Sequence, residues 1–254
     1  MKMNFKIKML GIFAILVAMS SCDNEDPIGS QITVYPVITL EGDDPYLVPL
    51  GAPFEDPGAT ATIGEEEVPL TTQFVGRYRG NVFTTLDTSV ADIYNLNYTA
   101  VNADGFSVTS ARQVIVANTG DLVNSIEGLY RSTVYRDGVQ GAPASAYTDI
   151  EYILIWKNAD GSYGISDAFG GWYLFGRAIA DSETPGGIIV ANNIATNDFS
   201  FPGTQTNTYF GGSAEIVGMT VDPVARTINV TTTWATTPPV TNYTFTFTLE
   251  QVTF

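Results

Sequence analysis

The feature of this sequence that most constrains its fold is the alternation of apolar and polar residues along short segments. Residues 92–101 read DIYNLNYTAV, and residues 243–249 read YTFTFTL. A period of two is typical of a strand that has one buried face and one solvated face. No window between residues 36 and 118 has a helical period. The sequence therefore predicts an all-β chain.

Two β-rich regions are expected, residues 35–118 and residues 126–254, joined by a polar linker at 119–125. In the first region, short runs of β-branched and aromatic residues separated by turn residues favour a seven-strand sandwich. The second region has segments for about eight strands, and hairpin turns such as Asp160-Gly161 punctuate it. A second β-sandwich and a closed β-barrel both fit this pattern.

The first region carries a motif. Residues 51–61, GAPFEDPGATA, match the pattern G-x-x-F/Y-x-D-P-G-A-x-A, and Tyr94 stands two residues before Leu96 as a tyrosine-corner residue does. This region resembles the bacterial surface immunoglobulin-like domains of Bacteroidota lipoproteins. The resemblance implies an immunoglobulin-like sandwich that serves as a spacer or a binding module. We also expect Tyr94 to be buried, with its hydroxyl bonded to nearby backbone. More loosely, the whole chain resembles two-domain Bacteroidota surface lipoproteins whose second half is uncharacterised.

The N-terminal segment predicts export. Lysines at positions 2, 6 and 8 precede an apolar stretch at residues 9–19, which is too short to span a membrane, and two serines then precede Cys22. MSSC resembles a lipobox, and the acids after it resemble a surface-export signal. We expect residues 1–21 to be a lipoprotein signal peptide, Cys22 to carry the lipid and residues 22–34 to be a flexible tether. The expected location is the outer membrane, facing the exterior. A plain secretory signal with an accidental cysteine is the alternative.

Charge and composition exclude several functions. The 27 acidic residues outnumber the 11 basic residues, which argues against nucleic acid as a partner and leaves the lipid as the contact with the membrane. The chain contains no histidine, so serine–histidine and cysteine–histidine nucleophiles and the usual zinc sites are absent. No glycine-rich loop followed by lysine is present to bind phosphate. No cofactor is therefore expected.

Carboxylates and calcium are the remaining chemistry. A glycoside hydrolase needs two acids across a cleft, and the candidates in the second region are Glu127, Asp149, Glu151, Asp167, Glu183 and Glu215. In so acidic a chain most such side chains are solvated, and we expect no enzyme. Asp43, Asp44 and Asp56 could offer oxygen ligands to Ca²⁺. Asp56 is more simply a turn residue before Pro57, and no EF-hand spacing is present.

Aromatic residues supply the ligand-binding candidates. All three tryptophans lie in the second region, where Trp172, Tyr173 and Phe175 follow two glycines and Tyr209 precedes two others. A flexible glycine loop could present Trp172 to solvent, and exposed rings stack against sugars. Trp156 and Trp234 lie in strand-like runs and are expected to fill the core.

Together these features predict a non-catalytic surface protein that binds a glycan, or another surface ligand, through its C-terminal domain. Two alternatives stay open: a structural or protein-interaction module that assembles with an outer-membrane transporter, and a two-carboxylate glycoside hydrolase. An exposed aromatic row beside polar groups favours the first function. A flat apolar patch favours assembly, and two facing acids in a cleft favour hydrolysis.

Overall fold

The computed structural model describes residues 32–79, 82–137 and 145–253. The expected signal segment and Cys22 lie outside the described residues. Tyr35–Phe254 forms one compact unit. None of the helices among the described residues is long and apolar enough to cross a membrane.

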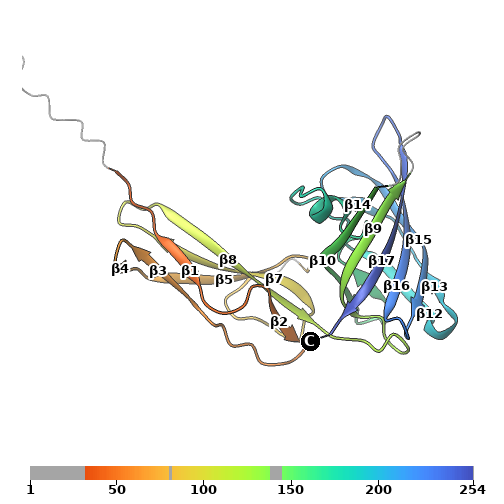
Figure 1. Ribbon diagram of the computed structural model, residues 1–254, viewed down its shortest axis with the longest axis horizontal. Helices are drawn as coiled ribbons and strands as arrows, with labels where there is room; N and C mark the ends of the chain where they lie inside the picture. The colour runs from red at the N-terminus through yellow and green to blue at the C-terminus, as the bar shows by residue number, and fades with distance from the viewer. Residues whose placement is uncertain (1–31, 80–81, 138–144, 254) are drawn as a thin grey trace, which may run out of the picture. The chain divides into compact units, whose positions relative to one another are not determined.

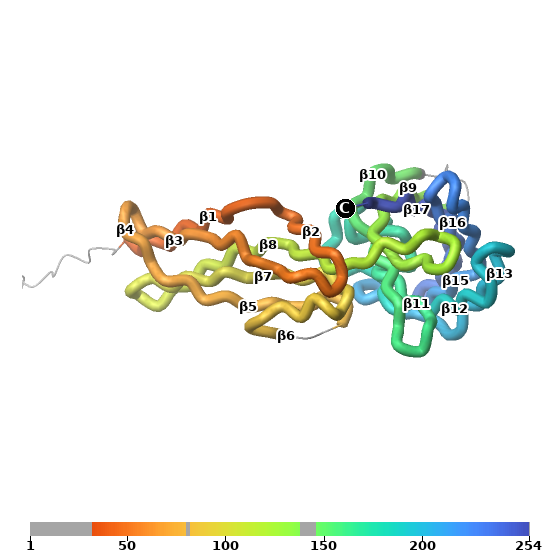
Figure 2. The backbone as a smooth tube through the Cα atoms, turned by 90° about the horizontal axis from the view of Figure 1, so that it is seen from below, coloured from red at the N-terminus to blue at the C-terminus, as the bar shows by residue number. Residues whose placement is uncertain are grey.

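The predicted all-β class is confirmed, and the first half is an immunoglobulin-like sandwich of two sheets. A five-stranded sheet has the order β2-β8-β7-β5-β6, and a smaller sheet has the order β1-β3-β4. Figure 2 shows β5, β7 and β8 side by side. Only β2 and β8 pair in parallel among these strands. The strands are β1 (Val37–Leu40), β2 (Tyr46–Pro49), β3 (Ala59–Ile63), β4 (Glu66–Glu67), β5 (Leu70–Gly76), β6 (Val82–Phe83), β7 (Asp92–Val101) and β8 (Ser107–Ala117).

The core of this sandwich follows from the alternation in β7. Tyr94, Leu96 and Tyr98 face inward and are each at most 1% exposed, while the asparagines between them are partly exposed. The hydroxyl of Tyr94 donates to the carbonyl oxygen of Val90 at 2.9 Å. The expected tyrosine corner is therefore confirmed.

The second half is a single curled sheet of nine strands, in the order β13-β12-β11-β10-β9-β17-β16-β15-β14 (Figure 1). The sequence left a sandwich and a barrel open for this half, and the structure has one curled sheet in place of two stacked ones. Within the described residues no pairing joins β13 to β14, so the ladder does not close into a barrel. The strands are β9 (Gly128–Asp137), β10 (Ser145–Lys157), β11 (Tyr163–Ile165), β12 (Gly187–Asn193), β13 (Asp198–Ser200), β14 (Gln205–Asn207), β15 (Gly211–Asp222), β16 (Thr227–Ala235) and β17 (Asn242–Val252).

Two short helical segments interrupt these strands, a π-helix η1 (Trp172–Gly176) and a 3-10 helix η2 (Ile194–Thr196). In β17, Phe245, Phe247 and Leu249 face the inside of the curl and are buried, with threonines on the outer face. The interior is filled by these residues and by the chain that leads into η1. One sheet can enclose a core in this way because its curl places strands that are distant in the sheet on opposite sides of the same core residues.

A separate hydrophobic cluster joins the two halves. Ile115 of β8 packs in it with Leu129 of β9 and with Leu154 and Trp156 of β10. Tyr78 stacks on Trp156 with ring centroids 6.0 Å apart. The segment 119–125 between the halves is a packed turn in which Leu122 is 1% exposed. We call the hydrophobic cluster of Ile115, Leu129, Leu154 and Trp156 the joint.

Candidate ligand-binding site

The structure places the predicted aromatic residues at different depths. Trp172 is 1% exposed and Tyr173 is 6% exposed, so the solvent exposure expected for this pair is wrong. Phe175 is partly buried against the same core. Only Tyr209 of the four is well exposed, at 63%.

The two glycines before Trp172 explain the error. Gly170 and Gly171 have φ values of +61° and +84°, in the left-handed region that favours glycine. A Cβ on Gly170 would lie 2.6 Å from Phe247, and one on Gly171 would lie 2.6 Å from Ile150. These glycines therefore let the backbone pack against the inner face of the sheet. They do not supply a flexible loop at the surface.

The carboxylate of Asp167 fixes this turn. It accepts hydrogen bonds from the backbone amides of Phe169, Gly171 and Thr184 at 2.8, 3.1 and 3.1 Å. Burial raises the pKa of Asp167 to about 7, against the lowering effect of the three amides. Asp167 was a candidate for catalysis, and its amide partners give it a structural role.

An aromatic cluster fills the curl and reaches its edge. Phe169 stacks on Phe245 at 4.2 Å, and Tyr173 lies 5.8 Å from Trp234. Phe210 continues the cluster outward, because its ring is 4.8 Å from Tyr173. Trp172 and Tyr173 therefore belong to a core whose last ring is exposed at the edge of the sheet.

Tyr209 is that last ring, and it is held rigidly. Its ring lies 4.8 Å from Phe210. Asn207, 1% exposed, accepts from the amides of Tyr209 and Phe210 through Oδ1. Its Nδ2 donates to the carbonyl oxygen of Ser182 at 2.6 Å and to Oγ1 of Thr184 at 3.0 Å. Asn207 could not be recognised from the sequence, because a polar residue in a loop has no local signal that predicts burial.

A groove of about 300 Å³ lies beside this loop, across β15, β16 and β17. Trp234 and Tyr243 occupy the middle row of these strands, and their rings face the inside of the curl, where they stack 5.5 Å apart. The side chains of the other lining residues are on the outer face of the sheet. We call the pair of rings behind the groove the aromatic wall. The Nε1 of Trp234 donates to the carbonyl oxygen of Gly211 at 3.0 Å, which ties the wall to the Tyr209 loop. We call this feature the rim groove; its lining residues are Ser213, Glu215, Thr233, Trp234, Ala235, Asn242, Tyr243 and Thr244.

The rim groove has no counterpart among the sites expected from the sequence. Tyr243 was recognisable as the inward-facing start of an alternating strand, but its partial exposure was not. The groove lies where β15 and β17 begin and β16 ends, at the same level of the sheet. Pairing of Ala214 with Trp234 and of Trp234 with Tyr243 sets that register.

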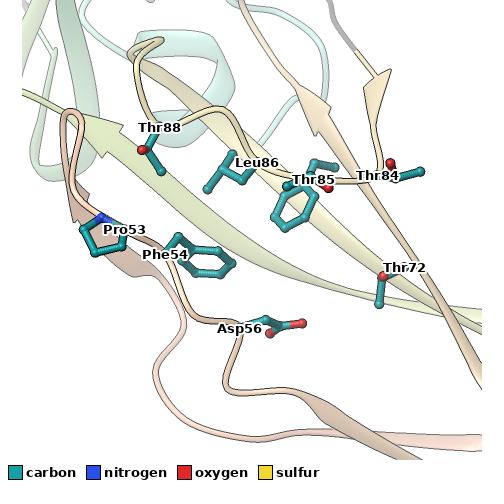
Figure 3. A pocket seen from close by; sticks show the side chains of 9 residues that line it. Pro53, Phe54, Asp56, Thr72, Thr84, Thr85, Leu86 and Thr88 are labelled. Carbon is teal, nitrogen blue, oxygen red and sulfur yellow. The ribbon is translucent and has the colours of Figure 1, made fainter.

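The immunoglobulin-like half carries a second hollow, of about 410 Å³ (Figure 3). Pro53, Phe54 and Leu86 form apolar parts of its wall, and four threonines and Asp56 add polar groups. Phe54 contacts Tyr46 and Phe74 edge-to-face at 5.4 and 5.9 Å. Threonines line both hollows, but this one has no tyrosine or tryptophan among its lining residues.

Asp56 has a structural partner inside the sandwich. Its Oδ1 lies 3.2 Å from Nη1 of Arg112, whose side chain is fully buried. The same oxygen accepts from the amide of Gly58 at 2.9 Å and from the hydroxyl of Tyr98. A buried guanidinium needs such a partner because an unpaired charge is costly away from water. The DPG motif therefore serves the fold.

The other calcium candidates lie apart from this network. Oδ1 of Asp44 accepts from the amide of Gln113 at 2.9 Å, and Asp43 is exposed. Throughout the part of the chain that the structure describes, no group of three or more acidic, histidine or cysteine side chains is placed to hold a metal ion. The structure does not bring Asp43, Asp44 and Asp56 together as a ligand set.

Most of the other candidate catalytic acids of the second half are paired with side chains of the chain itself. Glu183 pairs with Arg77 of the first half at 3.0 Å, and Glu151 pairs with Arg131. Glu127 accepts from Nδ2 of Asn118 at 2.8 Å. Asp149 is exposed. Glu215 lines the rim groove without a second acid among the lining residues.

Two family models match the chain. The bacterial surface protein, Ig-like domain, matches residues 38–116. A second model, described as a "-like, C-terminal domain", matches residues 119–251, which is more than half of the chain. Neither description names a catalytic activity.

Among solved structures, the chain is similar to the lipoprotein BT2262 from Bacteroides thetaiotaomicron. The two are 25% identical over 85% of this chain and 100% of that chain, with a TM-score of 0.61. A protein of unknown function from the DUF3598 family of Nostoc punctiforme is 10% identical over 76% of this chain and 82% of that chain, but its TM-score of 0.23 carries no argument. No curated protein matches the chain.

These matches agree with the resemblance to surface lipoproteins that the motif in residues 51–61 predicted. The chain therefore belongs to the family that this C-terminal domain defines, and it carries a bacterial surface Ig-like domain ahead of that domain.

Proposed function

We propose that this protein is a lipid-anchored protein of the outer-membrane surface that binds a glycan at its rim groove and catalyses no reaction on it. The observation that supports the proposal is the exposed ring of Tyr209, 63% exposed on a loop that Asn207 holds in place. An aromatic platform that is rigid before binding loses little entropy when a ligand stacks on it.

The lining of the rim groove suits a sugar. Ser213, Thr233 and Thr244 offer hydroxyl groups, Asn242 offers an amide and Glu215 offers a carboxylate. Such groups can pair with the hydroxyls of a sugar. The volume of about 300 Å³ is at the lower end for ligand pockets and suits a short segment of a glycan.

The anchor rests on the N-terminal pattern and on the relative. Cys22 follows a signal-like segment, and BT2262 is described as a lipoprotein. We propose that Cys22 carries the lipid, that the chain faces the exterior and that the Ig-like domain spaces the rim groove from the membrane. Mass spectrometry of the mature N-terminus tests this: an acylated Cys22 as first residue is expected, and an unmodified cysteine inside a longer chain contradicts it.

The binding site is tested on the mature chain without its lipid. A glycan array identifies a ligand, and its affinity is then measured for the wild type, Tyr209→Ala and Phe106→Ala. Phe106 is the control, because it is 47% exposed but lies in the first half. Tyr209→Ala is expected to weaken binding by about 1–3 kcal/mol, by analogy with bases stacked on aromatic rings. Its melting temperature is expected to stay near that of the wild type. Equal affinities for all three proteins would refute this site.

A further inference from the structure

The outer face of the curled sheet continues the polar lining of the rim groove. β9, β17, β16 and β15 are neighbours in the sheet (Figure 1). Thr233 and Thr244, which line the groove, pair across β16 and β17. In the next outward-facing row, Thr231 pairs with Thr246, and Thr246 pairs with Tyr135 of β9. Alternate residues of a strand point to the same face, so both rows are on the side of the sheet opposite the aromatic wall.

Tyr135 is an exposed aromatic ring on this outer face. It is 49% exposed, while the preceding Val134 is fully buried on the inner face. Its two cross-strand neighbours, Thr246 and Ala146, have small side chains and are exposed themselves. Within the described residues, Tyr135 has no hydrogen-bond partner for its hydroxyl and no ring contact. The ring is therefore open to a ligand.

Tyr135 supplies a group that the rim groove lacks. Trp234 and Tyr243 face the inside of the curl, so the groove presents hydroxyl, amide and carboxylate groups on its open side but no ring. Thr244 pairs with Asp137, two residues along β9 from Tyr135, so Tyr135 and Thr244 are diagonal neighbours. Such neighbours lie about 7–8 Å apart on a sheet. A ligand that fills the groove and extends over β17 on the same face therefore reaches the ring.

The charges on this face favour a neutral ligand. The outward-facing acids of the four strands are all exposed, namely Asp137, Glu215, Asp222 and Glu250. Arg131, a base on the same face, already pairs with Glu151. Like charges placed together disfavour binding, so carboxylate or sulfate groups on a ligand would be repelled here. Hydroxyl groups of a neutral sugar can donate to these carboxylates and can pair with the threonine hydroxyls.

We propose that Tyr135 is a second sugar-contacting residue, and that the ligand is a neutral glycan of several units that extends from the rim groove across β17 to β9. This inference rests on the proposed function and specifies the class and the length of its ligand. The ring of Tyr135 would stack on the apolar face of a sugar unit outside the groove. The structural alternative is that Tyr135 only stabilises the sheet through its cross-strand pair with Thr246.

The test compares long and short neutral glycans on the mature chain without its lipid. The hexasaccharides of cellulose, xylan and galactan, their disaccharides and hexagalacturonate are titrated into the wild type, Tyr135→Thr, Tyr135→Phe and Tyr35→Thr. Tyr135→Thr removes the ring and keeps a residue that favours strands, while Tyr135→Phe keeps the ring. Tyr35 is the matched control, because it is 52% exposed but lies in the first half.

The wild type is expected to bind a neutral hexasaccharide more tightly than its disaccharide and more tightly than hexagalacturonate. Tyr135→Thr should weaken the hexasaccharide by roughly 5- to 150-fold, by analogy with bases stacked on aromatic rings, and leave the disaccharide nearly unchanged. Tyr135→Phe should retain most of the affinity, and Tyr35→Thr should retain all of it.

Three results overturn the inference and leave the proposed function standing, provided that Tyr209→Ala weakens binding of the array ligand. They are an unchanged hexasaccharide affinity in a folded Tyr135→Thr, an equal loss for both lengths, and a wild type that binds none of the neutral hexasaccharides or prefers hexagalacturonate. A glycan array without any ligand overturns the proposed function as well.

Discussion

At the scale of single residues, the same hydrogen bond occurs in both halves of the molecule. The hydroxyl of Tyr94 donates to the carbonyl oxygen of Val90, and that of Tyr130 donates to the carbonyl oxygen of Ile126 at 2.6 Å. Both tyrosines are at most 1% exposed. A buried phenol needs an acceptor, and the carbonyl four residues earlier provides one without a side-chain partner. Only Tyr94 was predicted, because it lies within a recognisable immunoglobulin-like pattern.

The buried Asp167 makes a prediction about pH. Its pKa of about 7 in the folded chain is above the ordinary value of 3.8, so folding favours the protonated form. The contribution of Asp167 to the free energy of unfolding should therefore be fully present below about pH 4 and be lost as the pH rises to about 7, by at most about 4 kcal/mol. Asp167→Asn should lose this dependence, because the amide does not titrate.

Urea denaturation of the wild type and Asp167→Asn between pH 4 and pH 8 checks this prediction. Other carboxylates titrate in both proteins, so the difference between the two profiles isolates Asp167. The wild type should lose stability relative to the variant as the pH rises. A gain instead would mean that the amides of Phe169, Gly171 and Thr184 stabilise the carboxylate more than burial destabilises it.

At the scale of elements, the turn into β15 links the exposed Tyr209 to the aromatic wall behind the rim groove. Gly212 has φ +79°, and a Cβ on it would lie 2.4 Å from the carbonyl oxygen of Ala235 and 2.5 Å from Nε1 of Trp234. The indole can donate to the carbonyl oxygen of Gly211 only because this space is empty. The turn therefore holds the wall in position.

Gly212→Ala should disturb the rim groove, and Gly203→Ala is its matched control. Gly203 has φ +86° with nothing within 4 Å of its Cβ position, so its substitution costs about 1–2 kcal/mol for the backbone alone. Gly212→Ala should cost a further ~1–3 kcal/mol from overpacking. It should also change the near-ultraviolet circular dichroism of Trp234 and weaken glycan binding. Equal stability and equal spectra for the two variants would show that the turn yields without moving the wall.

The edges of the curled sheet are short. β13 and β14 have three residues each, and both are at the ends of the strand order. An edge strand presents unpaired backbone groups that can recruit another chain, and a short strand limits that surface. The length of these strands follows from the turns on either side of them, such as that around Gly203.

At the scale of the whole molecule, the joint ties the two halves together. Ile115, Leu129 and Leu154 are fully buried in the joint. Arg77 of the first half also pairs with Glu183 of the second half. Nε2 of Gln251 also donates to the carbonyl oxygen of Gly120 at 2.7 Å. Apolar burial at a boundary between domains couples their stabilities, since unfolding either one exposes surface of the other.

We expect the mature chain to unfold in one calorimetric transition. Trp156→Ala should lower the melting temperature and separate the transition into two, because it removes a joint residue that is 7% exposed. Val224→Ala is the control, since Val224 is 94% exposed and its truncation should leave the single transition unchanged. Two transitions in the wild type would show that the halves are independent.

The sequence by itself determined the all-β class, the immunoglobulin-like half and the tyrosine corner at Tyr94. These features depend on residues that are close together in the sequence, namely the period of two in β7 and the motif within residues 51–61. The tertiary structure alone decided which aromatic residues face solvent. In the sequence, Gly170 and Gly171 suggest a flexible backbone, but the side chains of Phe247 and Ile150 occupy the space beside them. Burial depends on residues that are distant in sequence, so Trp172 became core, Tyr209 remained exposed and Arg136 came to lie between two rings.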